Sequence, residues 1–356
     1  MDFKANTTSA IFITGNSRTG TSMVSKILGN NELIYGFKEL HFFEQLWYPE
    51  KNPDRLTKEQ GIKLFAELIS LQRQGSYADR TPEKFYEEAG NYFHPNDNDA
   101  VTAPFVFMNY LLYESSLYNK QIPCEQTPRN LFFIDEILSL WPNAKIVCMM
   151  RDPRDVLLSQ KYKWKLRSMG YKGMPIKEVI RAWFNYHPVT TSKLWNSCAE
   201  QIINAITKKN VYLLRFEELL KNPEQKIKEL CEFLNVEFDQ SMLLIPRVGS
   251  SLPHDQKGLG IDQNRTGHFL KELTSAEIYL CQKITVRYMK KFDYDIIPIR
   301  PNFFTLIVSW ISFPIKLFFA LLLNISRSKN FLNSISRRFF SKKRYETLKA
   351  YNELEN

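Results

Sequence analysis

The residues best suited to chemistry stand near the start of the chain, where a glycine-bounded loop holds a single arginine. A short apolar run that begins at Ile11 ends at Gly15, and the small-residue loop after it ends at Gly20. Strand, loop and helix N-terminus in this order present backbone N–H groups and a helix dipole to an anion. The spacing Gly15-x4-Gly20 fits the frame of a P-loop, but the next residue is Thr21 rather than lysine. The pattern therefore predicts a phosphate-binding loop whose cation is Arg18.

A second arginine marks a second predicted anion site. The apolar run 144–150 is a predicted buried strand that ends at Arg151, and Pro153 opens the helix after it. Ser159 lies eight residues after Arg151, about two helical turns into that helix. Ligands of α/β sheets bind at the carboxyl ends of strands, where a nucleoside triphosphatase would carry an aspartate for magnesium. An arginine and a hydroxyl favour a second phosphate; the alternative is a salt bridge within the segment.

Together the two segments resemble the sulfotransferases that use PAPS, 3′-phosphoadenosine 5′-phosphosulfate. The loop 16–22 is similar to that family's 5′-phosphosulfate loop, and Arg151 followed eight residues later by Ser159 matches its 3′-phosphate motif. The segment 264–269 looks like the family's glycine-centred loop that closes over the cofactor. The resemblance implies that PAPS and its product PAP are bound by Asn16, Ser17, Arg18, Thr19, Gly20, Thr21, Ser22, Arg151, Ser159, Arg265, Thr266 and Gly267.

The resemblance also implies a catalytic base. The segment 37–43, Phe-Lys-Glu-Leu-His-Phe-Phe, is similar to the active-site segment of the heparan-sulfate-type sulfotransferases, in which a glutamate is the base. By that likeness Glu39 takes the proton of the acceptor hydroxyl, Lys38 stabilises charge on the transferring group and His41 orients the acceptor. A positioned carboxylate contributes about 10²–10⁴-fold to such a reaction. Arg18 completes the catalytic set, because charge that develops on the departing phosphate needs a cation.

One segment departs from the family's pattern. The string 125–130, Glu-Gln-Thr-Pro-Arg-Asn, resembles a Glu-Lys-Thr-Pro segment of the family, but Gln126 stands in place of the lysine. The string 79–82 is similar and keeps a cation, Arg80, at an earlier place in the chain. The sequence leaves open whether Gln126 or Arg80 takes the position of the family's lysine.

The rest of the chain predicts the elements that hold these residues. Strands alternating with helices imply a three-layer α/β fold with a parallel central sheet and a P-loop-like nucleotide site. We expect residues 1–300 to form the catalytic domain, with 40–125 as an insertion that shapes the acceptor site. The predicted strands are 11–13, 144–150 and 210–215, and the predicted helices are 21–28, 60–73, 131–140, 156–165 and 223–234.

The C-terminal residues 301–356 form a separate helical tail in this interpretation. Nearly every residue of region 303–323 is apolar, with Pro314 and Lys316 as the interruptions, and as a helix of about 32 Å it is long enough to cross a bilayer. A lysine inside a span costs about 2.5–3.5 kcal/mol, so an anchor that lies in the membrane plane is favoured. A true span and a helix that docks on protein are the alternatives.

Charge and composition narrow the partners. Region 324–344 holds seven Lys and Arg and no acid, which fits anionic lipid, so residues 303–344 are expected to associate with a membrane. The net charge of +10 favours an anionic ligand; we expect no nucleic-acid partner. Residues 1–9 lack the pattern of a signal peptide, and five widely spaced cysteines read as reduced thiols, so a cytoplasmic catalytic domain is expected. The histidines have no metal-ligand spacing, and no metal is predicted.

These observations predict a sulfotransferase that moves the sulfuryl group of PAPS to the hydroxyl of a glycan, a glycolipid or another alcohol. Two alternatives stay open. A P-loop kinase of a small alcohol would need a lysine beside Gly20 and an acid for magnesium. A non-catalytic module that binds nucleotide or membrane would not need Glu39. The acceptor itself stays undetermined, because one fold and one cofactor site serve many acceptors.

Overall fold

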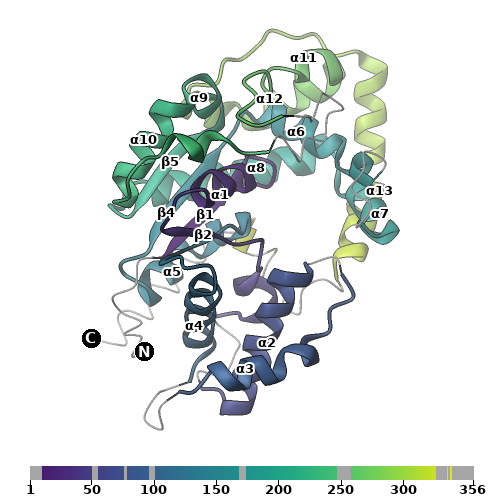
Figure 1. Cartoon of the computed structure of the whole chain (residues 1–356). Coiled ribbons are helices and arrows are strands. Elements are labelled where there is room, and N and C mark those ends of the chain that lie inside the picture. Colours follow the sequence, from purple (N-terminus) through teal and green to yellow (C-terminus); the bar gives the residue numbers. More distant parts are fainter. Residues whose placement is uncertain are drawn as a thin grey trace, which may run out of the picture.

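A central parallel sheet carries helices on both faces (Figure 1). The three-layer α/β fold expected from the sequence, with a helical C-terminal region, is confirmed. The computed structural model describes residues 10–49, 55–75, 78–95, 101–167, 174–246, 258–325, 335, 337 and 338 of the chain.

Five parallel strands form the sheet in the order β2-β3-β1-β4-β5. Their bounds are β1 Ile11–Gly15, β2 Ile34–Gly36, β3 Ile122–Glu125, β4 Lys145–Met150 and β5 Val211–Arg215. The sequence predicted β1, β4 and β5 but missed β2 and β3, which have three and four residues and are too short to show a periodicity. Gly15 lies beside Met149 in the β1–β4 pair, so the loops that follow these two strands meet at one edge of the sheet.

The helices and short helical turns have the following bounds. The α-helices are α1 Thr21–Gly29, α2 Lys58–Gln74, α3 Tyr86–Tyr92, α4 Ala103–Ser116, α5 Ile134–Leu140, α6 Pro153–Lys161, α7 Ile176–Asn185, α8 Pro188–Ala205, α9 Phe216–Lys221, α10 Pro223–Leu234, α11 Phe269–Glu272, α12 Ser275–Lys291 and α13 Phe303–Ile325. A π-helical turn, η1, covers Phe42–Leu46, and 3₁₀ turns are η2 Pro82–Phe85, η3 Pro128–Phe133, η4 Lys163–Arg167 and η5 Gln240–Leu243.

The two faces of the sheet bury different hydrophobic clusters, because successive residues of a strand point to opposite faces. Phe12 and Cys148 pack into the larger cluster, which includes buried residues of α2, α4, α8 and α12. Ile13 and Val147, their neighbours in sequence, pack into the second cluster with α1 and α10. The sheet is therefore buried on both sides, as expected for a parallel sheet.

Two helix starts set the geometry of the predicted site. Gly20 precedes α1 with φ 98°, and a Cβ there would lie 2.6 Å from the Phe216 ring, so the position requires glycine. Asp152 caps α6 by accepting a hydrogen bond from the Arg154 N–H at 2.8 Å, and Pro153 holds its first position. The helix after Arg151 therefore begins at Pro153, as the sequence indicated, and it ends at Lys161, before the end of the helical stretch predicted over 156–165.

Helices α2, α3 and α4 lie together at one end of the molecule (Figure 1). Their aromatic side chains, among them Phe65 and Phe107, belong to the same buried cluster as Phe12 of the sheet. They fall within the predicted insertion 40–125, whose last residues also form β3 of the sheet. The boundaries of this insertion and of the 1–300 domain stay predictions.

The C-terminal segment contains a long apolar helix and two arginines that contact the rest of the chain. By length and composition alone, α13 is the one helix in the described part of the chain that would suffice to cross a membrane. Arg337 donates to Glu136 at 2.7 Å, and Arg338 donates to Glu44 at 2.5 Å. These two cations of the basic segment therefore contact protein carboxylates; the other five lie outside the described residues.

Candidate active site

The loop between β1 and α1 is held mainly by its own backbone. Arg18 has a left-handed conformation with φ 76°, and the Thr19 hydroxyl donates to the Asn16 carbonyl at 2.7 Å. A Cβ on Gly15 would lie 2.5 Å from the Met149 carbonyl oxygen, so the loop passes directly over β4. Asn16 and Thr19 are buried, and Ser17 and Arg18 are half-buried. Thr21 begins α1, whose free N–H groups point towards the same space as the loop.

Arg18, Arg151 and Ser159 are brought together although they come from different elements. The Arg18 Nε donates to the Ser159 hydroxyl at 2.9 Å, and Arg151 Nη1 donates to the Arg18 carbonyl at 3.2 Å. The Arg151 guanidinium also lies over the Phe216 ring, 4.4 Å from its centre, a favourable cation–π contact. The two anion sites predicted from the sequence are therefore adjacent.

The segment around Gly267 closes on the same arginine. Arg151 Nη2 donates to the Arg265 carbonyl at 2.8 Å, and the Gly267 N–H donates to the Asp155 carboxylate at 2.9 Å. Thr266 lies between them with an exposed side chain. Burial raises the pKa of Asp155, while Arg151 opposes that rise.

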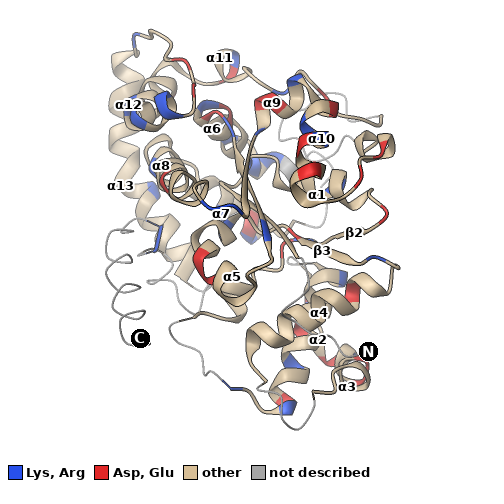
Figure 2. Cartoon of the chain, turned by 90° about the vertical axis from the view of Figure 1, so that its left-hand side faces the viewer, with Lys and Arg blue, Asp and Glu red and all other residues tan. Residues whose placement is uncertain are grey.

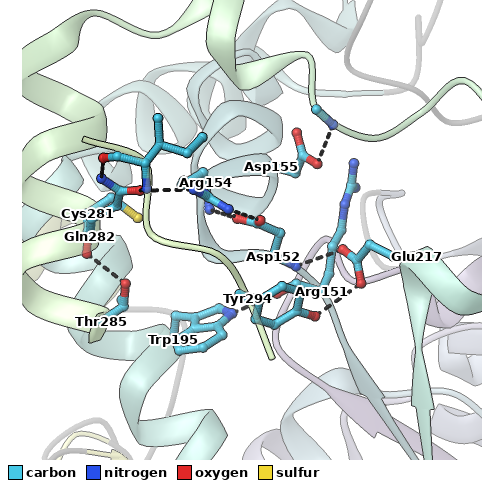
Figure 3. Close-up of polar contacts among 12 residues, drawn as sticks. Arg151, Asp152, Arg154, Asp155, Trp195, Glu217, Cys281, Gln282, Thr285 and Tyr294 are labelled. Carbon is cyan, nitrogen blue, oxygen red and sulfur yellow. Dashed lines mark hydrogen bonds and ion pairs between the residues drawn. The ribbon is translucent and has the colours of Figure 1, made fainter. Parts of the chain in front are cut away.

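Other buried groups fix Arg151 and the start of α6 (Figure 3). The Trp195 indole donates to the Arg151 carbonyl at 2.9 Å, and the Asp152 N–H donates to Glu217 at 2.8 Å. The Tyr294 hydroxyl donates to the second oxygen of Glu217 at 3.0 Å. Asp152 pairs with Arg154 at 2.6 Å, so it does not form the salt bridge to Arg151 that was the alternative explanation of this segment.

Two buried donors at this edge of the sheet are unpaired. Asn16 Nδ2 and Arg151 Nε have no hydrogen-bond partner among the described residues. An unpaired buried donor costs about 1–3 kcal/mol, so both nitrogens are suited to an anionic ligand. The arrangement of two arginines, a hydroxyl and a helix N-terminus fits a ligand with two separate phosphate groups.

The segment after β2 holds the predicted base. Glu39 and His41 lie 3.3 Å apart, with Glu39 partly exposed and His41 nearly buried. His41 has a left-handed conformation with φ 51° and caps η1. Burial of Glu39 works to raise its pKa, but the hydrogen bond and charge of His41, with smaller effects of Lys163 and Arg129, hold the pKa below its ordinary value. The Glu39 carboxylate is therefore ionised at neutral pH, and it is partly exposed to solvent.

A buried glutamate holds the backbone of this segment. Glu125 accepts hydrogen bonds from the Leu40 N–H at 3.2 Å, the Thr127 N–H at 3.1 Å and the Asn130 amide at 2.7 Å, and also from the Thr127 hydroxyl. Burial raises the pKa of Glu125 to about 7. Without this carboxyl, four donors beside the Glu39 segment would lose their acceptor.

Gln126 and Thr127 join the two parts of the site. The Ser22 hydroxyl at the start of α1 donates to Gln126 Oε1 at 3.2 Å, and the His41 N–H donates to the Thr127 hydroxyl at 3.2 Å. Gln126, which stands where the family's segment has a lysine, thus lies beside α1. Arg80 forms an ion pair with Glu67 of α2 instead. The backbone N–H of Lys38 donates to Gln72 at 2.9 Å, and Lys38 itself is exposed.

Several residues around the site were missed by the sequence reasoning. Phe216 and Glu217 directly follow β5, and their contacts with Arg151 and Asp152 depend on β5 lying beside β4. Glu125 opens the string 125–130, in which the resemblance concerned Gln126 and gave the glutamate no role. No sequence signal indicates Lys163 or Trp195, since the effect of Lys163 on Glu39 and the contact of Trp195 with Arg151 depend on tertiary packing. In the described part of the chain, no cluster of His, Cys, Asp and Glu is suited to a metal ion.

Residues 10–240 match the sequence profile of the Sulfotransferase family. Sulfotransferase 2A1 of Homo sapiens is 28% identical over 118 residues, which cover 33% of this chain and 38% of that protein. Carbohydrate sulfotransferase 1 of Danio rerio is 22% identical over 282 residues, which cover 65% of this chain and 64% of that protein. The chain spans between 26% and 64% of the length of these and the other curated relatives that it matches.

Solved structures with a similar fold include the sulfotransferase domain of the olefin synthase of Synechococcus PCC 7002. It has a TM-score of 0.49 and 17% sequence identity, and the alignment covers 83% of this chain and 98% of that domain.

Proposed function

Because the chain belongs to the Sulfotransferase family, we propose that it is an enzyme that transfers a sulfuryl group from PAPS to an acceptor hydroxyl. The observation that carries this proposal is the contact of Arg18 with Ser159 and of Arg151 with the Arg18 carbonyl. Two neighbouring cations support a ligand that carries phosphates on both the 3′ and the 5′ oxygen of one ribose. PAPS is such a ligand, and its anhydride supplies the activated sulfuryl group.

The predicted binding residues form two groups, one for the 5′-phosphosulfate of PAPS and one for its 3′-phosphate. The loop 16–20, Thr21 and Ser22 offer N–H groups, hydroxyls and the Arg18 cation to the 5′-phosphosulfate. Arg151 and Ser159 hold the 3′-phosphate, and the segment 265–267 covers it. The unpaired Asn16 Nδ2 and Arg151 Nε gain acceptors in this arrangement. No metal is needed, because the cations that balance the phosphate charge are side chains.

On the acceptor side, Glu39 acts as general base. Its lowered pKa keeps the carboxylate ionised, so it is ready to accept the hydroxyl proton as the oxygen attacks sulfur. His41 holds the carboxylate in place from 3.3 Å. Lys38 and Arg18 balance the charge that passes to the sulfuryl oxygens and the leaving phosphate. The displacement is in line, with attack from the side opposite the phosphate.

The acceptor class that we favour is the hydroxyl of a glycan or a glycolipid. The likeness of segment 37–43 to the heparan-sulfate-type enzymes supports it, as does the similarity to carbohydrate sulfotransferase 1 of Danio rerio. The similarity to a 3-beta-hydroxysteroid sulfotransferase of Cavia porcellus leaves other alcohols open. The expected position of the catalytic domain is the cytoplasm. A kinase is disfavoured because Thr21 follows Gly20 and β4 is followed by Arg151, where a kinase carries lysine and an acid.

Calorimetry with PAP and AMP tests the donor assignment. PAP carries the additional 3′-phosphate, and charged hydrogen bonds to it are worth about 1.5–3 kcal/mol, so PAP should bind about 10–150-fold more tightly than AMP. Arg151→Met should remove that difference, whereas Arg287→Met, an exposed arginine of α12, should keep it. Equal binding of PAP and AMP by the wild-type protein would remove the main support for the proposal. Transfer from radiolabelled PAPS to glycan and lipid extracts would then identify the acceptor.

A further inference from the structure

The long apolar helix α13 has its polar side towards the protein. All five of its polar side chains follow one stripe at helical spacing: Thr305, Ser309, Ser312, Lys316 and Asn324. Each of these residues is half-buried, and the helix is in contact with α7, α8 and α12. The exposed residues of α13 are all apolar: Phe303, Phe304, Ile307, Val308, Trp310, Ile311, Pro314, Ile315, Phe318, Phe319, Leu321, Leu322 and Ile325. A surface helix of a water-soluble protein has the opposite arrangement.

Polar contacts fix the inner stripe along most of the helix. The Lys316 ammonium donates to the carbonyls of Trp183 and Tyr186, at 3.3 and 3.1 Å, and lies over the Trp183 ring. Asn324 donates to the side chain of Asn185 at 2.7 Å. At the C-terminal end, Arg181 donates to the Leu323 carbonyl at 3.1 Å. The Lys316 ammonium, which would be costly inside a membrane span, therefore has hydrogen-bond acceptors within the protein.

Helix α7 shares this arrangement in part, since it also exposes the polar residues Lys177 and Asn185. Arg181 is buried in it, whereas Ile176, Ile180 and Trp183 are 63%, 46% and 45% exposed. These three residues follow one another at intervals of four and three, so they form one apolar stripe. α7 and α13 lie side by side at the edge of the molecule away from β5 and α10 (Figure 1). Their outward apolar side chains form one surface, here called the α7–α13 surface.

The chemistry of the α7–α13 surface fits lipid better than protein. Protein interfaces carry polar groups, about one hydrogen bond per 100–200 Å², yet no polar side chain of α13 faces outward. Apolar patches of this extent mark interaction sites. α13 is almost entirely tan when charged residues are coloured (Figure 2), and the sequence after it is basic without an acid up to position 344. Arg337 and Arg338 of that segment pair with the protein carboxylates Glu136 and Glu44. An apolar helix followed in sequence by further cations is typical of segments that bind anionic membranes in the plane of the bilayer.

We propose that the α7–α13 surface seats the protein on an anionic lipid bilayer, with α13 lying flat in the interface rather than crossing it. Both ends of α13 are then on the same side of the membrane. The surface adjoins the segment of Glu39. The turn η4 packs against α7, and the charge of its Lys163 contributes to lowering the pKa of Glu39. This inference concerns binding alone and does not depend on sulfotransferase activity.

Vesicle flotation of the full-length protein tests the surface. Vesicles of phosphatidylcholine and phosphatidylglycerol should bind the wild-type protein more tightly than phosphatidylcholine alone. The double variant Ile180→Asp, Phe318→Asp places a charge on each helix, and we expect vesicle partition to fall at least ~10-fold. Leu117→Asp at the end of α4, where Leu117 is 51% exposed, should leave partition within about twofold. Circular dichroism melts of all variants establish that they fold.

Two results would overturn the proposal. One is vesicle binding that is absent in the wild-type protein or unchanged in the double variant. The other is a wild-type dimer in gel filtration that the double variant converts to a monomer without any effect of lipid, which would assign the surface to a second copy of the chain.

Cysteine labelling separates the flat orientation from a span. The five native cysteines are buried and free, so Asn302→Cys, at the exposed position just before α13, and Asn324→Cys, on the polar side of its last turn, add one thiol each outside the apolar surface at the two ends of α13. In sealed inverted membrane vesicles from expressing cells, an impermeant maleimide should label both. Labelling of one end alone, with the other labelled only after the vesicles are opened, would show a span.

Discussion

Two loops of the site follow parallel strands and yet are held in different ways. The loop 16–20 follows β1, and the segment 37–41 follows β2; each contains a left-handed residue that is not glycine, Arg18 or His41. The first loop is fixed by glycines, by its own backbone and by the Phe216 ring. The second is fixed by the buried carboxyl of Glu125, while Glu44 in the next turn pairs with Arg129 and Arg338.

The structure of loop 16–20 depends on packing, whereas that of segment 37–41 depends on pH. The contacts described above for the 16–20 loop join backbone, hydroxyl and guanidinium groups, and its shape depends on the space around Gly15 and Gly20. The backbone of segment 37–41 depends on a carboxyl whose pKa lies near neutrality. Substitutions should therefore affect donor binding and acceptor chemistry separately.

Glu39→Gln should produce the largest effect. The amide keeps the shape of the carboxylate but cannot accept a proton, so turnover with the true acceptor should fall about 10²–10⁴-fold. The affinity for PAP, measured by calorimetry, should stay within about twofold of wild type, because Glu39 belongs to the other loop. Glu87→Gln on α3 serves as the control. Undiminished turnover in Glu39→Gln would show that another group is the base.

The second prediction concerns Glu125 and pH. Burial raises its pKa from an ordinary 4.5 to about 7, so the folded protein binds this proton more readily than the unfolded chain. Its contribution to the free energy of unfolding therefore decreases as pH rises from 4.5 to 7. At 1.36 kcal/mol per pH unit the decrease amounts to about 3 kcal/mol.

Urea unfolding of wild type and Glu125→Gln between pH 4.5 and 8 measures this contribution. The free energy of wild type minus that of the variant should fall through the window and become level above pH 7. Glu232→Gln, an exposed acid of α10, should show no such trend. A constant difference for Glu125→Gln would mean that the carboxyl keeps an ordinary pKa.

A pair of glycine variants tests the packing of the donor loop. Gly20 has φ 98° and ψ 12°, the left-handed conformation, and a Cβ there would lie 2.6 Å from the Phe216 ring. Gly90 of α3 has no positive φ, and a Cβ there would meet nothing within 4 Å, so Gly90→Ala should keep the unfolding free energy or raise it by up to about 1 kcal/mol. Gly20→Ala should lose about 1–2 kcal/mol for the left-handed conformation and about 1–3 kcal/mol more because Phe216 must move, and should bind PAP more weakly. A loss in Gly20→Ala of no more than about 2 kcal/mol would show that the Phe216 ring does not constrain the loop.

Ser159→Ala should have the smallest effect. It removes one hydroxyl that accepts from Arg18 at 2.9 Å, a contact worth about 1 kcal/mol. The affinity for PAP should fall about fivefold, and the unfolding free energy should fall by no more than about 1 kcal/mol. Ser116→Ala in α4 is the control, and a PAP affinity equal to that of wild type would exclude Ser159 from the 3′-phosphate site.

The same two loops show what a sequence can and cannot predict. The β1–α1 loop was predicted because glycines at a fixed spacing after an apolar run report local backbone geometry, and the parallel sheet followed from the alternation of elements. β2 and β3 were missed because a strand of three or four residues has no measurable period. Glu125 and Phe216 act only once β3 and β5 lie in the sheet, so their roles depend on tertiary contacts. The outward apolar face of α13 likewise depends on which side packs against α7.

Phe216 limits the separation of the two predicted anion sites. One part of its ring fills the space that Gly20 leaves open, and its face lies 4.4 Å from the Arg151 guanidinium. The loop and the arginine therefore cannot separate without disturbing the same ring. A ligand that fills both anion sites places its second phosphate at a high effective concentration once the first is bound, whereas a ligand with one phosphate, or with two at another separation, gains no such advantage. The distance between the two anions, rather than the identity of the base, then becomes the first property by which this site distinguishes nucleotides.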